Sequence, residues 1–177
     1  YHKKIINQES SKGFLKLIQK NGKTEGNRTI ATNMLETFER FSRSKNAVEF
    51  TLLDVDSKKH QLSDFRGKPV YLNFWSNTSI PSLRELKVMK VLHEKYRKKI
   101  HFISINLDDD ESINQSIQSK NAYEWTFLHF GNDYELREKY QVTTIPTYFL
   151  IDENGGLIKA FAEGPVDVEK RLYNLVK

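Results

Sequence analysis

One apolar run constrains the fold of this chain more than any other feature. Residues 70–75 read Val-Tyr-Leu-Asn-Phe-Trp and follow a Gly-Lys-Pro segment. A run with so few polar residues predicts a strand that is buried on both faces. After a polar segment at 76–79, apolar residues recur every three or four positions up to Tyr96. This spacing predicts a helix of about four turns, so the region is a strand-to-helix junction.

Strand and helix patterns alternate along the rest of this region. The strand patterns occupy residues 50–53, 60–62, 100–105, 125–130, 148–151 and 157–161. The helical patterns occupy residues 110–121 and 133–140, and a last one runs from about Pro165 to the end. Parallel strands joined by helices, with hairpins at both ends, predict an α/β fold. We expect a central mixed sheet with helices on both faces.

The N-terminal segment carries a different pattern. Two amphipathic stripes are separated by the helix-breaking sequence Asn-Gly-Lys at 21–23. The stripes consist of Phe14, Leu15, Leu17 and Ile18, and of Ile30, Met34, Leu35, Phe38 and Phe41. Two short helices cannot bury such stripes alone, so we expect them to pack on the following domain, on an upstream domain or on a partner. The predicted organisation is a helical segment and linker at 1–46, the remnant of an upstream region, and one domain at 47–177.

The charge of the chain points away from a nucleic-acid partner. The formal net charge is +5, but residues 1–47 hold ten Lys and Arg against four Asp and Glu, and residues 48–177 hold 18 against 19. Scattered lysines on a helix are usually a solvated face rather than a polyanion site, so we expect no nucleic acid. No apolar run is long enough to span a bilayer. A membrane anchor, if the protein has one, is expected upstream of Tyr1.

The absence of cysteine limits the chemistry. With no cysteine in the sequence, the chain as written has no disulfide, no thiolate and no cysteine-ligated zinc. The histidines lack metal-ligand spacing, so we expect no metal and no cofactor. In an α/β sheet the reactive position lies where a central strand ends and the next helix begins, here after Trp75. A helix N-terminus lowers the pKa of a cysteine placed there, but Ser79 and Ser82 stand at this junction.

Three segments carry a resemblance to a known family. In chain order they are "FTLLDVDSKKHQLSDFRGKPV", "VYLNFWSNTSIPSLREL" and "VTTIPTYFLIDENGGLI". Together they resemble the ResA/TlpA group of thioredoxin-like thiol-disulfide oxidoreductases over roughly residues 47–177. The resemblance implies a thioredoxin-like three-layer sandwich. It places Ser79 and Ser82 on the two redox cysteines, Ile80 and Pro81 between them, and Thr78 on a preceding tryptophan.

The same resemblance implies the surroundings of the site. Pro146, after Ile145, matches a cis-proline that exposes backbone to an extended peptide, so a protein or peptide partner is expected in the groove there. Asn73, two residues before Trp75, falls where thioredoxins carry a buried aspartate, and asparagine also fits the ResA-like branch. Asp109 falls near an acidic residue of some of these enzymes, although a solvated helix start also explains it. The group is extracytoplasmic, which implies the bacterial periplasm or cell envelope.

The functional hypotheses differ in how they explain the two serines. Serine has no accessible disulfide state, so we expect the chain as given to be inactive as an oxidoreductase. Hydrolysis by Ser79 would need an oriented base, and no histidine is placed at the junction. A helix N-cap is the favoured role of Ser79 or Ser82.

Three hypotheses remain open. The chain is a redox-silent binding or accessory module, an oxidoreductase whose cysteines were replaced by serine through mutagenesis, or a scaffold for the basic helical segment 1–45. Thr78 in place of the family's tryptophan favours the first, because removal of the thiols alone would leave that position unchanged.

Overall fold

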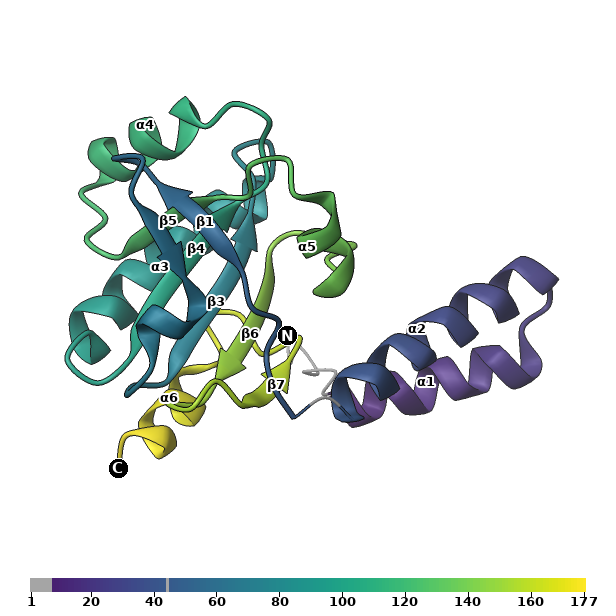
Figure 1. Ribbon diagram of the computed structural model, residues 1–177. Coiled ribbons are helices and arrows are strands. Elements are labelled where there is room, and N and C mark those ends of the chain that lie inside the picture. Colours follow the sequence, from purple (N-terminus) through teal and green to yellow (C-terminus); the bar gives the residue numbers. More distant parts are fainter. Residues whose placement is uncertain (1–7, 44) are drawn as a thin grey trace. The chain divides into compact units, whose positions relative to one another are not determined.

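The computed structural model describes residues 8–43 and 45–177, without the side chains of residues 8–12, 37, 38 and 40–43 (Figure 1). The chain divides into two compact units, Tyr1–Lys45 and Asn46–Lys177. Within the described residues, no helix combines the length and the apolar character that crossing a membrane requires.

The first unit is a helical hairpin of α1 (Gln8–Asn21) and α2 (Glu25–Arg43). Leu15 of α1 packs with Ala31 and Leu35 of α2, and Ile18 adds partial cover. Each helix therefore covers the inner half of the other's stripe, a packing that the sequence pattern alone did not predict. The outer positions, Phe14, Leu17, Ile30 and Met34, are exposed. Phe38 and Phe41 lie outside the described side chains.

The second unit contains a seven-stranded sheet in the order β2-β1-β5-β4-β3-β6-β7. Its strands are β1 (Thr51–Asp54), β2 (Lys59–Gln61), β3 (Val70–Trp75), β4 (His101–Asn106), β5 (Thr126–His129), β6 (Thr147–Ile151) and β7 (Leu157–Ala160). Its helices are the 3₁₀ turn η1 (Leu62–Phe65), α3 (Ile80–Tyr96), α4 (Ser112–Asn121), α5 (Tyr134–Lys139) and α6 (Glu169–Leu175). The neighbours β3, β4 and β5 run parallel, and the other neighbouring pairs run antiparallel. This is the predicted mixed sheet.

The side chains of β3 alternate between two apolar layers. Tyr71 and Trp75 pack with Leu86 of α3, in a cluster that also includes residues of α4 and α6. On the opposite face, the Phe74 ring lies 5.1 Å from the ring of Tyr140, directly after α5. Helices therefore cover both faces of the sheet, and every residue of β3 is buried, as the apolar run predicts. This double packing fixes the strand end from which α3 begins.

The last helix begins later than the sequence pattern predicts. It starts at Glu169 instead of about Pro165. The backbone N–H groups of Asp167 and Val168 both donate to the carbonyl O of Gly164, each at 3.0 Å. These two bonds close a tight turn, so the chain becomes regularly helical only after it.

Candidate functional site

Ser79 is the N-cap of α3. It has an extended backbone (φ −95°, ψ 105°), and its Oγ accepts a hydrogen bond from the N–H of Ser82 at 3.3 Å. Its hydroxyl donates to the carbonyl O of Ile145 at 3.4 Å. The Ile145–Pro146 peptide bond is cis. Ser79 therefore lies between the start of α3 and the loop before β6, two parts of the site that the resemblance places together.

Ser82 occupies a different environment one turn into the helix. It is only 1% exposed, and its Oγ has no hydrogen-bond partner among the described residues. A buried hydroxyl left without a partner costs roughly 1–3 kcal/mol. Sulfur is a much weaker hydrogen-bonding atom and is often buried. The environment of Ser82 therefore suits a thiol better than the hydroxyl that is present.

The loop between β3 and α3 is held by Asp108, which follows β4. The Ser76 hydroxyl donates to Asp108 Oδ1 at 2.5 Å, and the N–H of Asn77 donates to Oδ2 at 2.7 Å. Ser76 Oγ in turn accepts from the N–H of Thr78 at 3.1 Å and from its hydroxyl at 2.7 Å. Sequence reasoning named the neighbouring Asp109, which makes none of these bonds. The available signal was the position of Asp108 at the C-terminal edge of the sheet, beside the end of β3.

A histidine belongs to the same network but is not free to act as a base. His129 Nε2 lies 2.7 Å from the carbonyl O of Asp108, and Nδ1 lies 3.1 Å from the backbone N of Gly131. Because a carbonyl only accepts and an N–H only donates, Nε2 carries the proton and Nδ1 is the acceptor. Both ring nitrogens are engaged. This arrangement does not supply the oriented base that hydrolysis by Ser79 would need.

Two of the predicted site residues lie beneath the site. Asn73 is 1% exposed; its Oδ1 accepts from the Ser104 hydroxyl at 2.6 Å, and Ser104 Oγ accepts from the Trp125 indole N–H at 2.8 Å. Trp75 is fully buried. Side chains at these depths cannot touch a bound partner, so Asn73 and Trp75 support the site from below.

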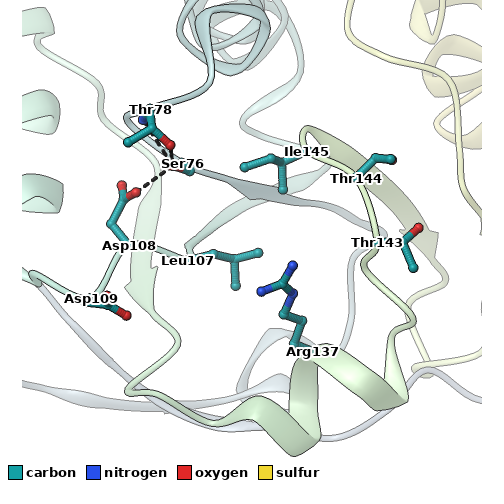
Figure 2. A pocket seen from close by; sticks show the side chains of 9 residues that line it. All are labelled: Ser76, Thr78, Leu107, Asp108, Asp109, Arg137, Thr143, Thr144 and Ile145. Carbon is teal, nitrogen blue, oxygen red and sulfur yellow. Dashed lines mark hydrogen bonds between the residues drawn. The ribbon is translucent and has the colours of Figure 1, made fainter.

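A polar cavity of about 260 Å³ opens beside the junction. Figure 2 shows its nine lining residues, which are Ser76, Thr78, Leu107, Asp108, Asp109, Arg137, Thr143, Thr144 and Ile145. Three of these, Thr78, Asp109 and Ile145, are predicted site residues. The predicted residues Ile80 and Pro81 are exposed at the start of α3 and do not line the cavity.

Glu85 is a further residue that sequence reasoning missed. It lies one turn after Ser82 on α3, and its Oε2 accepts from the Tyr148 hydroxyl at 2.6 Å. Burial, together with the nearby Tyr71 and the Glu85 carboxylate, raises the pKa of Tyr148 well above its ordinary range. Tyr148 therefore stays protonated and keeps donating. The spacing of three residues from Ser82 places Glu85 on the same helix face, which is the signal that the sequence contained.

Within the described part of the chain, no three His, Asp or Glu side chains are grouped so that they could hold a metal ion. The polar groups at the junction instead bond to one another and to the backbone.

Comparison with known proteins identifies the family. A family profile described as thioredoxin-like matches residues 67–157. The thiol-disulfide oxidoreductase ResA of Geobacillus kaustophilus is 30% identical over 151 residues, which cover 83% of this chain and 86% of that protein. A putative thiol-disulfide oxidoreductase from Bacteroides vulgatus has a solved structure that is 28% identical, with a TM-score of 0.67, and the match covers 75% of this chain and 94% of that one. A putative thiol:disulfide interchange protein DsbE from Chlorobium tepidum is 26% identical, with a TM-score of 0.65 and coverage of 74% and 94%.

The strand-to-helix junction, the loop at Pro146 and these likenesses agree with the resemblance found in the sequence. The chain belongs to the thioredoxin-like family, in its ResA-type group of thiol-disulfide oxidoreductases, and has serine at both positions of the redox cysteines.

Proposed function

We propose that this chain is a redox-silent member of its family that binds an extended peptide or protein segment without forming a covalent bond. The observation that carries the proposal is the replacement of the nucleophilic thiol by Ser79, within a site whose supporting contacts are intact. Ser79 caps α3 and bonds to the loop at Ile145, and Asp108 holds the preceding loop. The frame that would present a thiol to a partner is therefore retained, but the thiol is not.

The backbone before Pro146 offers a surface for an extended segment. The N–H groups of Thr143, Thr144 and Ile145 donate no hydrogen bond to any described residue. Thr143 and Thr144 are also exposed. Exposed backbone N–H groups without a partner are available to the carbonyl groups of an extended peptide. This arrangement supports a peptide that lies across the mouth of the cavity, above Ser79.

Reduction of insulin disulfides tests the redox part of the proposal. The chain as given is expected to show no turnover, because neither serine can form a disulfide. The double variant Ser79→Cys/Ser82→Cys is expected to gain weak activity, since the helix N-terminus and the buried second position are already present. Measurable turnover by the unchanged chain would refute redox silence.

The rival explanation is an oxidoreductase in which mutagenesis replaced both cysteines. Thr78 argues against it, because its N–H and its hydroxyl both bond to Ser76 and so integrate threonine into the loop. The codons at positions 79 and 82 of the source gene decide the matter. Cysteine codons there would establish the rival, and serine codons would eliminate it.

An extracytoplasmic location, in the bacterial periplasm or cell envelope, belongs to the same proposal. It is supported by the resemblance to the ResA/TlpA group. Fusion of alkaline phosphatase to the C-terminus of the complete gene product tests it, since this reporter folds into an active enzyme only where disulfides form. An inactive but stable fusion would contradict the proposed location.

A further inference from the structure

The cavity beside Ile145 contains a cation with unused hydrogen-bond donors. Arg137 of α5 lines the cavity, and Figure 2 shows its guanidinium directed inward, toward Leu107 and Ile145. Its Nε donates to the carbonyl O of Val142 at 3.1 Å, which fixes the orientation of the planar group. Its two Nη groups make no hydrogen bond or ion pair with the described residues. Arg137 is therefore held in place without a charged partner.

The two carboxylates of the cavity do not fill this role. Both oxygens of Asp108 are occupied, by the Ser76 hydroxyl, the N–H of Asn77 and the Asn106 side-chain amide, at 2.5 to 2.7 Å. Figure 2 shows Asp108 turned toward Ser76, and Asp109 on the far side of the cavity from Thr143. Neither forms an ion pair with Arg137. A guanidinium with free N–H groups in a polar cavity is a ready site for an anion, and its planar fork matches a carboxylate.

We propose that Arg137, with the adjacent Thr143 and Thr144, binds one carboxylate of the partner, supplied by an acidic residue close in sequence to the residue that lies over Ser79. This inference rests on the proposed peptide-binding function and adds the chemistry of the partner. Thr143 and Thr144 line the same cavity, and their hydroxyl groups can donate to an anion as well. Asp109 lines the same cavity, and its negative charge repels a phosphate dianion more strongly than a singly charged carboxylate, so the site favours the carboxylate.

The absence of a thiol gives this contact its importance. A family member with cysteine holds its partner through a mixed disulfide, whereas Ser79 cannot. Affinity and selectivity then depend on noncovalent contacts alone. A partly exposed Arg–carboxylate contact is expected to favour an acidic partner by about three- to tenfold.

The test uses the full chain with Ser79→Cys, which contains one thiol. The ligands are short peptides that differ at a single position, which is Glu, Gln or Lys. Each peptide also contains one cysteine, present as a mixed disulfide with 2-mercaptoethanol. The protein thiolate attacks the peptide sulfur, the peptide–protein disulfide forms, and 2-mercaptoethanol leaves as the thiolate. Excess 2-mercaptoethanol keeps the exchange reversible. The fraction of protein that carries peptide, measured by intact mass spectrometry, then reports the noncovalent preference.

The variable residue is placed in turn at each of the neighbouring positions on both sides of the cysteine. At one of them the Glu peptide is expected to be captured three to ten times more than the Gln peptide, and the Lys peptide least. Adding Arg137→Gln should remove this preference, and Arg137→Glu should reverse it in favour of Lys. Lys139→Gln is the matched control: it removes one charge from the same helix, where Lys139 pairs with Glu135 outside the cavity, and should keep the preference.

Two results separate this inference from the function on which it rests. If Gln peptides are captured better than N-acetylcysteine but Glu gives no advantage, or if Arg137→Gln leaves the advantage unchanged, the carboxylate site is refuted and peptide binding stands. If no peptide is captured better than N-acetylcysteine, the proposed peptide-binding function itself is refuted.

Discussion

At the scale of single residues, two serines of the same motif have opposite effects on the fold. Ser79 satisfies an N–H group at the start of α3, whereas the buried Ser82 hydroxyl has no partner in the described part of the chain. The motif is thus one good helix cap followed by one poorly accommodated polar group. Stability measurements on single variants can separate the two.

Alanine at each position should change stability in opposite directions. Ser79→Ala removes the cap and is expected to lower the free energy of unfolding by about 1 kcal/mol. Ser82→Ala removes an unsatisfied hydroxyl and is expected to raise it by about 0.5–1 kcal/mol. Urea unfolding followed by circular dichroism measures both. A loss of stability in Ser82→Ala would mean that its hydroxyl has a partner in solution.

Asp108 should contribute more to stability than its neighbour. Asp108→Ala leaves the N–H of Asn77 and the Ser76 hydroxyl without their acceptor, so the free energy of unfolding is expected to fall by about 2–3 kcal/mol. Asp109→Ala is the control, because Asp109 is exposed and accepts none of these bonds. It is expected to change stability by less than about 0.5 kcal/mol. Equal effects of the two variants would contradict the assigned role of Asp108.

Sequence reasoning found the residues of the site that lie within one motif and missed those that distant segments contribute. Ser79, Thr78 and Ile145 belong to contiguous motifs. Asp108 follows β4, whereas Arg137 belongs to α5. Both reach the cavity only because the sheet order and the loops bring these segments together. No local pattern distinguishes Arg137 from the other basic residues of the chain. Its significance comes from the direction of its side chain and from its two Nη groups, which bond to no described residue.

At the scale of elements, the C-terminal part of the sheet is tied to the last helix by one carboxylate. Glu163 follows β7 and accepts hydrogen bonds from Lys159 of β7 at 2.8 Å and from Arg171 of α6 at 2.8 and 3.0 Å. Burial alone would raise the pKa of Glu163, but the bonds from Arg171 and Lys159 outweigh it and lower the pKa from 4.5 to about 2. The charged form of Glu163 therefore stabilises the fold.

This contribution should disappear in acid. Because the pKa in the folded state lies below the ordinary value, the stabilisation is complete above about pH 5 and is lost as the pH falls toward about 2. At neutral pH, Glu163→Gln is expected to be less stable by about 1 kcal/mol, since solvent screens this partly exposed cluster. The difference should shrink as the pH falls across that range. Glu135→Gln, in an exposed pair with Lys139, is the control and should cost less than about 0.5 kcal/mol. A difference that grows in acid would contradict this account.

Element types followed from the sequence more reliably than element ends. The apolar run of β3 and the spacing in α3 specify these elements, because burial and helical periodicity are local properties. The start of α6 depends on the Gly164 carbonyl accepting two N–H groups in a turn, which no hydrophobic pattern records. The mutual packing of α1 and α2 was also missed, because the pattern shows an apolar stripe without showing what covers it.

At the scale of the whole molecule, each of the two units contains an apolar cluster of its own. Leu15, Ala31 and Leu35 form the cluster of the helical hairpin, and the α/β unit has its own around β3 and α3. The first residues of the α/β unit are bonded to the rest of it, since the N–H of Ala47 donates to the carbonyl O of Gly155 at 3.0 Å. Each unit is thus stabilised by apolar contacts among its own residues.

The fragment 46–177 should therefore fold by itself. Its thermal unfolding is expected to stay cooperative, with a midpoint within about 4 °C of the transition of this unit in the full chain, because the apolar cluster around β3 and α3 consists of residues of this unit. Differential scanning calorimetry measures this. Retained peptide capture by a Ser79→Cys form of the fragment would also count against the hypothesis that the segment 1–45 is the interacting part. A midpoint lowered by more than about 10 °C would show that the hairpin is required.

The loss of both thiols also bears on how long a complex with the proposed partner would last. In a two-cysteine enzyme the second thiol ends the encounter by attacking the mixed disulfide, so chemistry sets the time of release. With serine at both positions no mixed disulfide forms, so under the proposed function the partner leaves only by dissociation. For a complex of micromolar affinity and ordinary association rate, the residence time is about 0.1–10 s. Under the proposed function, the two serines therefore replace a chemical release step with a dissociation rate, and sequence changes at the groove can adjust that rate without any redox partner.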